Sequence, residues 1–292
     1  MHQSVLTEKV ISYLDPKPNQ NFIDCTVGAG GHTKAILEKT GPKGKVLGLD
    51  LNEEAIVKIR TWSKEKKMGA RLYLKEENFA HVTDAAKEER FKLVRGIVLD
   101  LGLSSDQLES SGRGFSFKKS EPLDMRYSLK NPVTAEKILN FFSRQDLERI
   151  FKEYGEEQFA KEIAEAVVKA RAEKHIKRTD QLVAIILQAT PRWYQGKKIH
   201  AATKTFQALR IEVNRELENL KEVLPQSVDL LEKEGTLVVI SFHSLEDRMV
   251  KTFFKDNPAL TLLTKKPVIA SVHEIQDNPR SRSAKLRAAR KK

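Results

Sequence analysis

Cysteine is nearly absent from this sequence, because Cys25 is the only one in 292 residues. A single thiol cannot form a disulfide within the chain or supply a cysteine-rich zinc site. The seven histidines show no spacing typical of metal ligands, so no metal is expected. Long apolar runs are also missing, since the longest are strand-sized and a bilayer needs roughly 20 residues. The polar N-terminus lacks the apolar core of a secretory signal, so we predict a cytoplasmic protein without membrane contact.

Positive charge is abundant. The formal net charge is +12, with 40% hydrophobic and 32% charged residues, which suits a globular protein with one large domain or two ordinary ones. A basic balance favours polyanionic partners such as nucleic acid, through release of counterions. The alternative is a solvated basic surface with no partner.

The first hundred residues alternate short apolar runs with helical patterns, which indicates a parallel α/β sheet. We expect strands at 21–26, 45–50, 71–75 and 96–100, with helices at 32–39 and 53–67. The next convincing strand, 236–242, follows only after roughly 130 residues, far more than a βαβ crossover needs.

This long interval is rich in helical patterns, among them 158–173 and 179–189. We therefore predict a discontinuous catalytic domain, 1–104 and 205–292, interrupted by a helical insertion at 105–204 that serves substrate recognition. The pattern at 205–220 would return the chain to the sheet.

Two capping boxes mark helix starts, at 143–146 and at 244–247. An edge strand is expected at 261–264. The last segment, 279–292, carries seven Lys or Arg side chains and is interpreted as a basic tail that contacts phosphates.

A glycine-rich turn follows the first expected strand. Gly28 and Gly30 would permit a tight turn and close approach of the backbone to a ligand, and Asp50 would accept hydrogen bonds from the hydroxyls of a ribose. A dinucleotide site needs a third glycine, where this chain has Thr33. Asp24 favours a cationic ligand over a pyrophosphate. These residues favour a methyl donor, S-adenosylmethionine, over a nicotinamide dinucleotide; a turn without ligand is the remaining alternative.

Asp100 ends the fourth expected strand, beside the same ligand site. An exocyclic amine is a poor nucleophile, and a carboxylate there would accept its hydrogen bond and help remove its proton. Alternatively, Asp100 caps the next turn or binds the donor. Methylation at a pyrimidine C5 commonly needs a cysteine nucleophile, and Cys25 lies on the first strand as a small buried side chain. We therefore argue against C5 chemistry.

Several further residues are candidates for RNA contact. Arg113 and Phe115 lie in a Gly-rich loop whose basic and aromatic side chains suit an unstacked base, although the phenylalanine could equally pack on the core. His243 would end the fifth strand and contact RNA or move a proton, or simply be a hydrogen-bonded histidine. Arg248, in the following helix, would bind phosphate or be solvated.

Seven sequence blocks occur together in one order. They are Thr26–His32, Asp100–Ser105, Arg113–Phe117, Glu121–Arg126, Tyr154–Glu157, Ala202–Arg210 and Ile240–Arg248. Together they closely resemble the bacterial 16S ribosomal RNA cytosine-N4 methyltransferase family, the MraW type, over nearly the whole chain.

The resemblance implies a class I, Rossmann-like, S-adenosylmethionine-dependent methyltransferase with a helical insertion. It implies methylation of the exocyclic N4 of a cytosine in the decoding region of 16S RNA, with the small ribosomal subunit as partner; a homodimer is left open. It also implies that the donor is held by Gly30, Gly31, His32, Asp50, Phe79, Asp100 and Gln107.

Two positions depart from general methyltransferase patterns. Thr26 occupies a position that is usually the first glycine of the loop, and Leu101 and Gly102 follow Asp100 where two prolines are usual. Two other functions remain as alternatives: a nicotinamide-dependent dehydrogenase, and a catalytically silent RNA-binding protein on the same scaffold.

Overall fold

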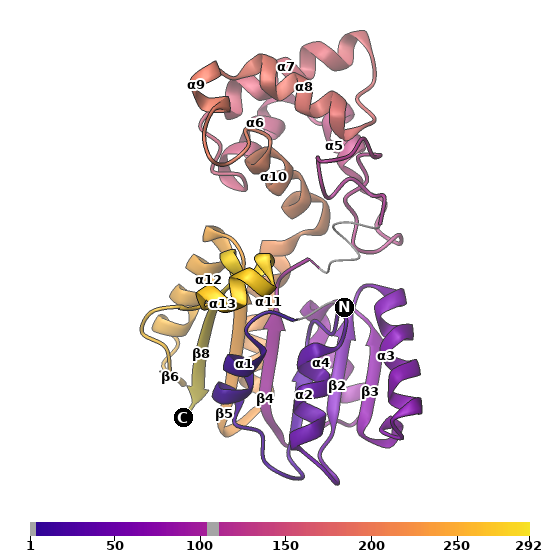
Figure 1. Cartoon of the computed structure of the whole chain (residues 1–292), viewed down its shortest axis with the longest axis vertical. Helices are drawn as coiled ribbons and strands as arrows, with labels where there is room; N and C mark the ends of the chain where they lie inside the picture. The colour runs from indigo at the N-terminus through magenta and orange to yellow at the C-terminus, as the bar shows by residue number, and fades with distance from the viewer. Residues whose placement is uncertain (1–3, 104–110) are drawn as a thin grey trace. The chain divides into compact units, whose positions relative to one another are not determined.

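The structure is a computed structural model that describes residues 4–103 and 111–292. The chain forms two compact units. Unit 1 comprises Met1–Gly102 and Leu217–Lys292, and unit 2 comprises Leu103–Glu216. Figure 1 shows the elements of both units, which are described separately below. No helix of the described residues is long and apolar enough to cross a membrane.

Unit 1 is built on a single sheet, which contains eight strands in the described residues, in the order β3-β2-β1-β4-β5-β8-β6 with β7 beside β8. The first five strands run parallel, as predicted, and β8 runs antiparallel to β5. The strands are β1 (Asn21–Asp24), β2 (Val46–Asp50), β3 (Leu72–Glu76), β4 (Val94–Asp100), β5 (Leu231–Ser241), β6 (Leu260–Leu262), β7 (Val268–Ile269) and β8 (Lys285–Lys291).

Helices cover both faces of the sheet because successive strand residues point to opposite sides. Ile23, on β1, packs in a core with α4, α11 and α12, whereas its neighbour Phe22 packs in a second core with α1, α2 and α3. These two layers explain why the strands are apolar throughout. The helices of this unit are α1 (Thr7–Leu14), α2 (Gly31–Lys39), α3 (Glu53–Glu65), α4 (Val82–Glu88), α11 (Glu216–Leu230), α12 (Ser244–Asp256) and α13 (Val272–Asp277), with short 3₁₀ turns at Gly69–Arg71, Phe79–His81 and Pro279–Ser283.

The basic C-terminal segment is a strand of this sheet, so its interpretation as a basic tail is wrong. β8 lies between β5 and β6 and pairs with both. Arg287 is buried, and its guanidinium donates to Asp247 on α12. Lys291 donates to the carbonyl of Leu231. Backbone pairing and buried small apolar residues therefore decide the structure of a segment whose composition indicated a solvated tail.

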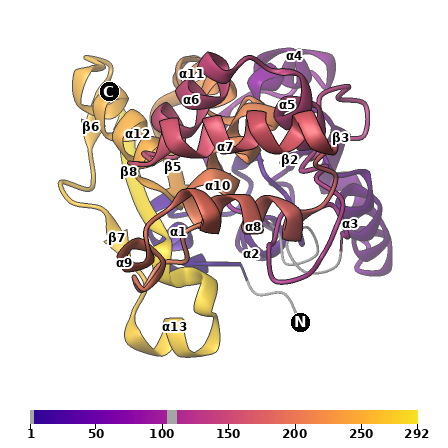
Figure 2. The ribbon, with the colours of Figure 1, turned by 90° about the horizontal axis from the view of Figure 1, so that it is seen from above.

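Unit 2 is helical and has one hydrophobic core of its own. Its helices are α5 (Ala135–Phe141), α6 (Arg144–Glu153), α7 (Ala160–Glu173), α8 (Thr179–Ala189), α9 (Arg192–Gln195) and α10 (Thr203–Asn214). Ser143 caps α6 as predicted, since its hydroxyl accepts a hydrogen bond from the N–H of Asp146. Figure 2 shows these helices from above.

The boundary of unit 2 differs from the predicted insertion 105–204. α10 was expected to return the chain to the sheet, but it contacts α5 and α6 and contributes Phe206 and Leu209 to the helical core. It ends at Arg215, whose left-handed backbone (φ 50°) breaks the helical pattern before α11 begins. The continuous pattern at 205–220 is therefore two helices.

Candidate active site

The carboxyl ends of the parallel strands bring several of the predicted residues to one edge of unit 1. Gly28 and Gly30 lie in the loop between β1 and α2, Asp50 ends β2, and Asp100 ends β4. Phe79 begins the 3₁₀ turn that follows β3, and it is half-buried against the core. Gln107 lies outside the described residues.

The glycines of the loop differ in why they must be glycine. Gly28 has a left-handed backbone (φ 50°), and a Cβ there would meet nothing closer than the Thr26 carbonyl oxygen at 3.9 Å. A Cβ on Gly30 would lie 2.1 Å from the Ile59 side chain, and one on Gly31 would lie 2.1 Å from the Ser4 hydroxyl. Gly30 also has a left-handed backbone (φ 79°), so both conformation and packing explain it, and packing explains Gly31. Gly28 differs because its side is open to a ligand.

Asp50 connects the loop to the sheet. Its carboxylate accepts hydrogen bonds from the backbone N–H of Gly28 (2.7 Å) and of Asn52 (2.8 Å). Burial raises the pKa of Asp50 from 3.8 to about 6, although these two N–H donors act against the rise. A carboxylate with this pKa is desolvated and still has free lone pairs, and both properties suit an acceptor for ligand hydroxyls.

Asp24 does not face the ligand site, so the prediction that it attracts a cationic ligand is not supported. Its side chain is fully buried, accepts a hydrogen bond from the Thr33 hydroxyl at 2.6 Å, and accepts another from the N–H of Thr26. Thr33 is the residue that replaces the third glycine of a dinucleotide loop. Its hydroxyl joins α2 to β1 by a hydrogen bond where a dinucleotide-binding fold uses close packing on glycine.

A buried histidine contacts the carboxylate that ends β4. His32 is 3% exposed, and its Nε2 lies 3.3 Å from Asp100 Oδ2. Burial by itself lowers the pKa of His32, but the hydrogen bond to Asp100 and the charges of Asp100 and Asp24 outweigh it, so that the pKa is raised overall. Its Nδ1 is buried and has no hydrogen-bond partner among the described residues.

Asp100 is held from several sides but stays partly open, with 18% of its side chain exposed. Its backbone N–H donates to the Thr26 hydroxyl at 2.7 Å, which gives a structural role to the threonine that replaces the usual first glycine. Gly102 is needed two residues later because a Cβ there would lie 2.6 Å from the Phe242 ring. The unusual sequence after Asp100 therefore serves close packing against the residue that follows β5.

His243 also lies at this edge, after β5, and it caps α12. Its Nδ1 accepts a long hydrogen bond from the N–H of Glu246, and the carboxylate of Glu246 accepts one from the N–H of Phe242. The sequence pattern predicted Ser244 as the capping residue. The helix instead begins at Ser244, and the residue that caps it is His243. Arg248 is exposed on the same helix.

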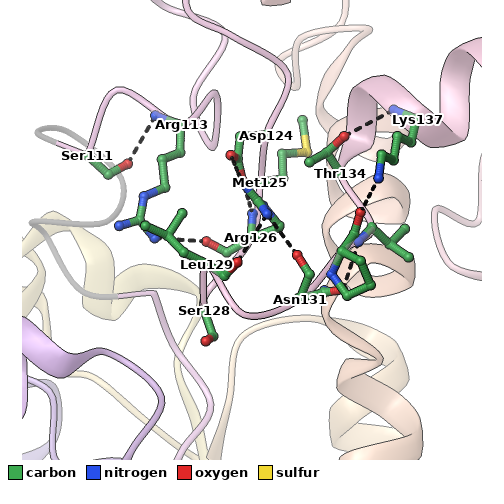
Figure 3. Close-up of polar contacts among 12 residues, drawn as sticks. Ser111, Arg113, Asp124, Met125, Arg126, Ser128, Leu129, Asn131, Thr134 and Lys137 are labelled. Carbon is green, nitrogen blue, oxygen red and sulfur yellow. Dashed lines mark hydrogen bonds and ion pairs between the residues drawn. The ribbon is translucent and has the colours of Figure 1, made fainter.

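In unit 2, Arg113 and Phe115 have different environments. One amino group of Arg113 donates to the carbonyls of Arg126 and Tyr127, as Figure 3 shows in part. Phe115 is only 8% exposed and its ring stacks on Tyr127, with centroids 5.7 Å apart. Phe115 is therefore a core residue here, which contradicts its predicted contact with an unstacked base.

Asp124 and Arg126, at the end of the block Glu121–Arg126, form an ion pair. Two guanidinium nitrogens donate to the two carboxylate oxygens at 2.9 and 2.8 Å. The Arg126 hydrogen bonds lower the pKa of Asp124, against the effect of burial, which raises it. Arg126 also donates to the Asn131 carbonyl, so the pair fixes the loop before α5 (Figure 3).

The N-terminal segment is a part of the site that sequence reasoning missed. Ser4 lies against Gly31, and the Leu6 N–H donates to the Glu274 carboxylate, which comes from α13. A polar N-terminus gave no signal for this contact.

The only cysteine, Cys25, is buried beside the loop, and burial raises its pKa well above the ordinary value, so the thiol stays protonated and unreactive.

Comparison with known proteins gives matches over the full length. The family model described as the MraW methylase family matches residues 1–292. Curated relatives named Ribosomal RNA small subunit methyltransferase H include one from Syntrophotalea carbinolica, 44% identical over 99% of this chain and 98% of the relative. Another, from Kosmotoga olearia, is 45% identical over 99% and 96% of the two chains.

Among solved structures, a Clostridium thermocellum protein described as an rRNA-methylase has a TM-score of 0.50 and 13% identity, over 100% of both chains. At that identity the likeness concerns the fold alone. Together with the strand order, it confirms the predicted Rossmann-like α/β fold.

Proposed function

Because the chain belongs to the MraW methylase family, we propose that it transfers a methyl group from S-adenosylmethionine to small-subunit ribosomal RNA. The names of the relatives indicate both the reaction, methyl transfer, and the substrate, small-subunit ribosomal RNA. The observation that supports it in this chain is the meeting of Gly28, Asp50 and Asp100 at one sheet edge of a class I methyltransferase fold. Membership of a methylase family argues against a dehydrogenase. So does Thr33, which stands where a dinucleotide-binding loop needs its third glycine.

The residues at this edge fit the methyl donor. Asp50 would accept the ribose hydroxyls, Gly28 would let the ligand approach the backbone, and the half-buried Phe79 would cover the adenine. The unpartnered Nδ1 of His32 offers a further polar contact. Gly30, Gly31 and Gln107 remain part of the proposed donor site on the family resemblance. When bound, S-adenosylmethionine supplies an electrophilic methyl group.

For the acceptor we propose the exocyclic N4 of a cytosine in the decoding region of 16S RNA. The nitrogen lone pair is delocalised into the ring, so the amine must be oriented and must lose a proton as the N–C bond forms. Asp100 is the candidate for both tasks, because its carboxylate is partly exposed. Among the residues that the structure describes, it contacts His32 and accepts a long hydrogen bond from the N–H of Gly102. Cys25 is buried and protonated, which argues against a covalent C5 mechanism.

RNA contacts are proposed on both units. Arg113, His243 and Arg248 remain candidates, and unit 2 is proposed to serve substrate recognition. Phe115 is left out because its ring is buried. We place the reaction in the cytoplasm, where small ribosomal subunits are found. The proposed chemistry needs one copy of the chain, and light scattering would test for a homodimer.

One experiment tests the proposal. The protein, methyl-labelled donor and small ribosomal subunits are incubated, and the labelled nucleotide is then mapped by nuclease digestion and mass spectrometry. The expected result is a single N4-methylated cytosine in 16S RNA. Binding of donor without any transfer would favour the silent RNA-binding alternative, and label on a ring carbon would contradict the chemistry at Asp100. Asp100→Asn, which keeps the shape but cannot take the proton as a carboxylate does, should lower turnover more than donor affinity.

A further inference from the structure

A surface of unit 2 away from the predicted residues combines an exposed tryptophan with several cations. The ten residues 191–200 contain Arg192, Lys197 and Lys198 and no acidic residue. Trp193, on the short helix α9, is 60% exposed although it is the largest apolar side chain a protein can carry. Among the described residues, none of these three cations forms an ion pair with a carboxylate.

The tryptophan is held in place by its buried neighbours. Its ring meets Phe159 and Tyr194 edge-on, with centroids 5.8 and 6.0 Å apart. Tyr194 is buried, and its hydroxyl donates to the carboxylate of Glu157 at 2.7 Å. Gln195 anchors the end of the helix by donating to the carbonyls of Leu187 and Thr190. Because buried neighbours already hold the exposed indole in place, it loses little conformational entropy when a ligand stacks on it.

Cations stand next to the indole. Lys197 Nζ lies 4.9 Å from the centroid of the Trp193 ring and 5.0 Å from that of Tyr194. Lys198 and Arg192 are exposed in the same segment. His200 is exposed as well, and its ring stacks on Phe117 at 4.8 Å, which links this segment to the loop that contains Arg113.

We propose that Arg192, Trp193, Lys197, Lys198 and His200 form a contact surface for single-stranded RNA. Every base has a π-face, so an exposed indole can stack on an unpaired base of any sequence, while neighbouring cations contact the flanking phosphates. An apolar protein partner would not need the excess of positive charge, and a duplex would keep its bases stacked on one another. The inference deepens the proposed function and rests on it, because it assigns a part of the RNA to unit 2.

The chain has two tryptophans, which allows a direct test. In the full chain with Trp62→Phe, Trp193 is the only indole, and an unstructured 12-nucleotide RNA should quench its fluorescence in a saturable way. A blunt duplex RNA should quench it much less. By fluorescence polarisation at fixed salt, Trp193→Ala should weaken binding of the single strand roughly 5- to 100-fold. Trp193→Phe should recover most of the loss, and Trp193→Leu should not.

The contribution of the cations is measured by the salt dependence of RNA binding. Lys197→Ala with Lys198→Ala should reduce the slope of log affinity against log salt by about 1.4, at about 0.7 per phosphate contact on a single strand. Lys161→Ala is the matched control, because Lys161 is exposed on α7 beside Glu162 and should leave the slope unchanged.

The outcomes separate this inference from the proposed function. If the single strand binds but neither quenches Trp193 nor responds to Trp193→Ala, the surface does not contact RNA, and the inference is overturned. Failure of the single strand to bind at all overturns it too. Methyl transfer to small subunits is measured separately, with Trp193→Ala expected to raise KM more than it lowers kcat. A quench with no methyl transfer by the unmodified chain would refute the proposed reaction and leave this RNA surface supported.

Discussion

Replacing Asp50 with asparagine should make the free protein more stable and the donor site weaker. A carboxyl whose pKa rises from 3.8 to about 6 costs the folded state about 3 kcal/mol when it is ionised. Asparagine removes the charge and keeps the shape, but it has one acceptor oxygen for the N–H groups of Gly28 and Asn52. The loss of one such hydrogen bond lowers the expected stabilisation by about 1 kcal/mol. Asp50 also retains some exposure to water, so the net stabilisation is expected at about 1–2 kcal/mol.

The gain depends on pH in a defined direction. Between pH values near 4 and near 6 the folded protein holds the Asp50 proton and the unfolded chain does not, so the contribution of this group to stability falls as pH rises through that window. Above it the penalty is complete. Asp50→Asn should therefore raise Tm at pH 8 by roughly 2–4 °C for each kcal/mol, and the gain should shrink as pH falls toward 4.

Donor binding should change in the opposite direction. Hydrogen bonds to a charged acceptor contribute about 1.5–3 kcal/mol, so Asp50→Asn should weaken S-adenosylmethionine binding on the order of 10- to 100-fold at pH 8. Calorimetry measures the affinity, and thermal unfolding at a series of pH values measures the stability. Asp84→Asn is the control, because Asp84 is exposed on α4. An Asp50→Asn protein that is no more stable than the unmodified one refutes the burial argument, and one that binds donor normally refutes the ribose assignment.

Three other substitutions test the mechanism, the attachment of β8 and the packing at Gly102. Cys25→Ala should keep most of the methyl transfer, and complete loss of turnover in a folded variant would revive a covalent mechanism. Arg287→Ala should lower the free energy of unfolding in urea by about 3 kcal/mol, because Asp247 loses its buried partner and keeps only Lys285, which is partly exposed and lies 3.6 Å away. A cost below 1 kcal/mol would mean that the end of the chain is only weakly attached. Gly102→Ala should cost about 1–3 kcal/mol through the clash with Phe242, and the cost should disappear in a Phe242→Ala background if the ring is its cause.

Much of the catalytic core could be predicted because its signals are local. The first four strands, the glycine turn and the acids at two strand ends lie within a few residues of the predicted positions, since hydrophobic period and turn chemistry depend on neighbours in the sequence. Helix α8 was predicted with the bounds that it has. Parallel strands then bring Asp50 and Asp100 to one edge whatever else the chain does.

Other features depended on partners far away in the sequence. Whether Asp24 faces a ligand was decided by the hydroxyl of Thr33, and whether Phe115 is exposed was decided by Tyr127. No local pattern reports such contacts.

The C-terminal segment 279–292 shows most clearly what the sequence determines and what the tertiary structure decides. Its composition determined that seven cations lie in fourteen residues, but the pairing of β8 with β5 decided that the segment is a strand, and Asp247 decided that Arg287 is buried. The sequence by itself determined which elements form, the polarity of each face and the glycine loop with its acids. The tertiary structure decided which of the polar side chains are consumed by internal hydrogen bonds, because burial removes a group from the surface only once its partner has been brought to it.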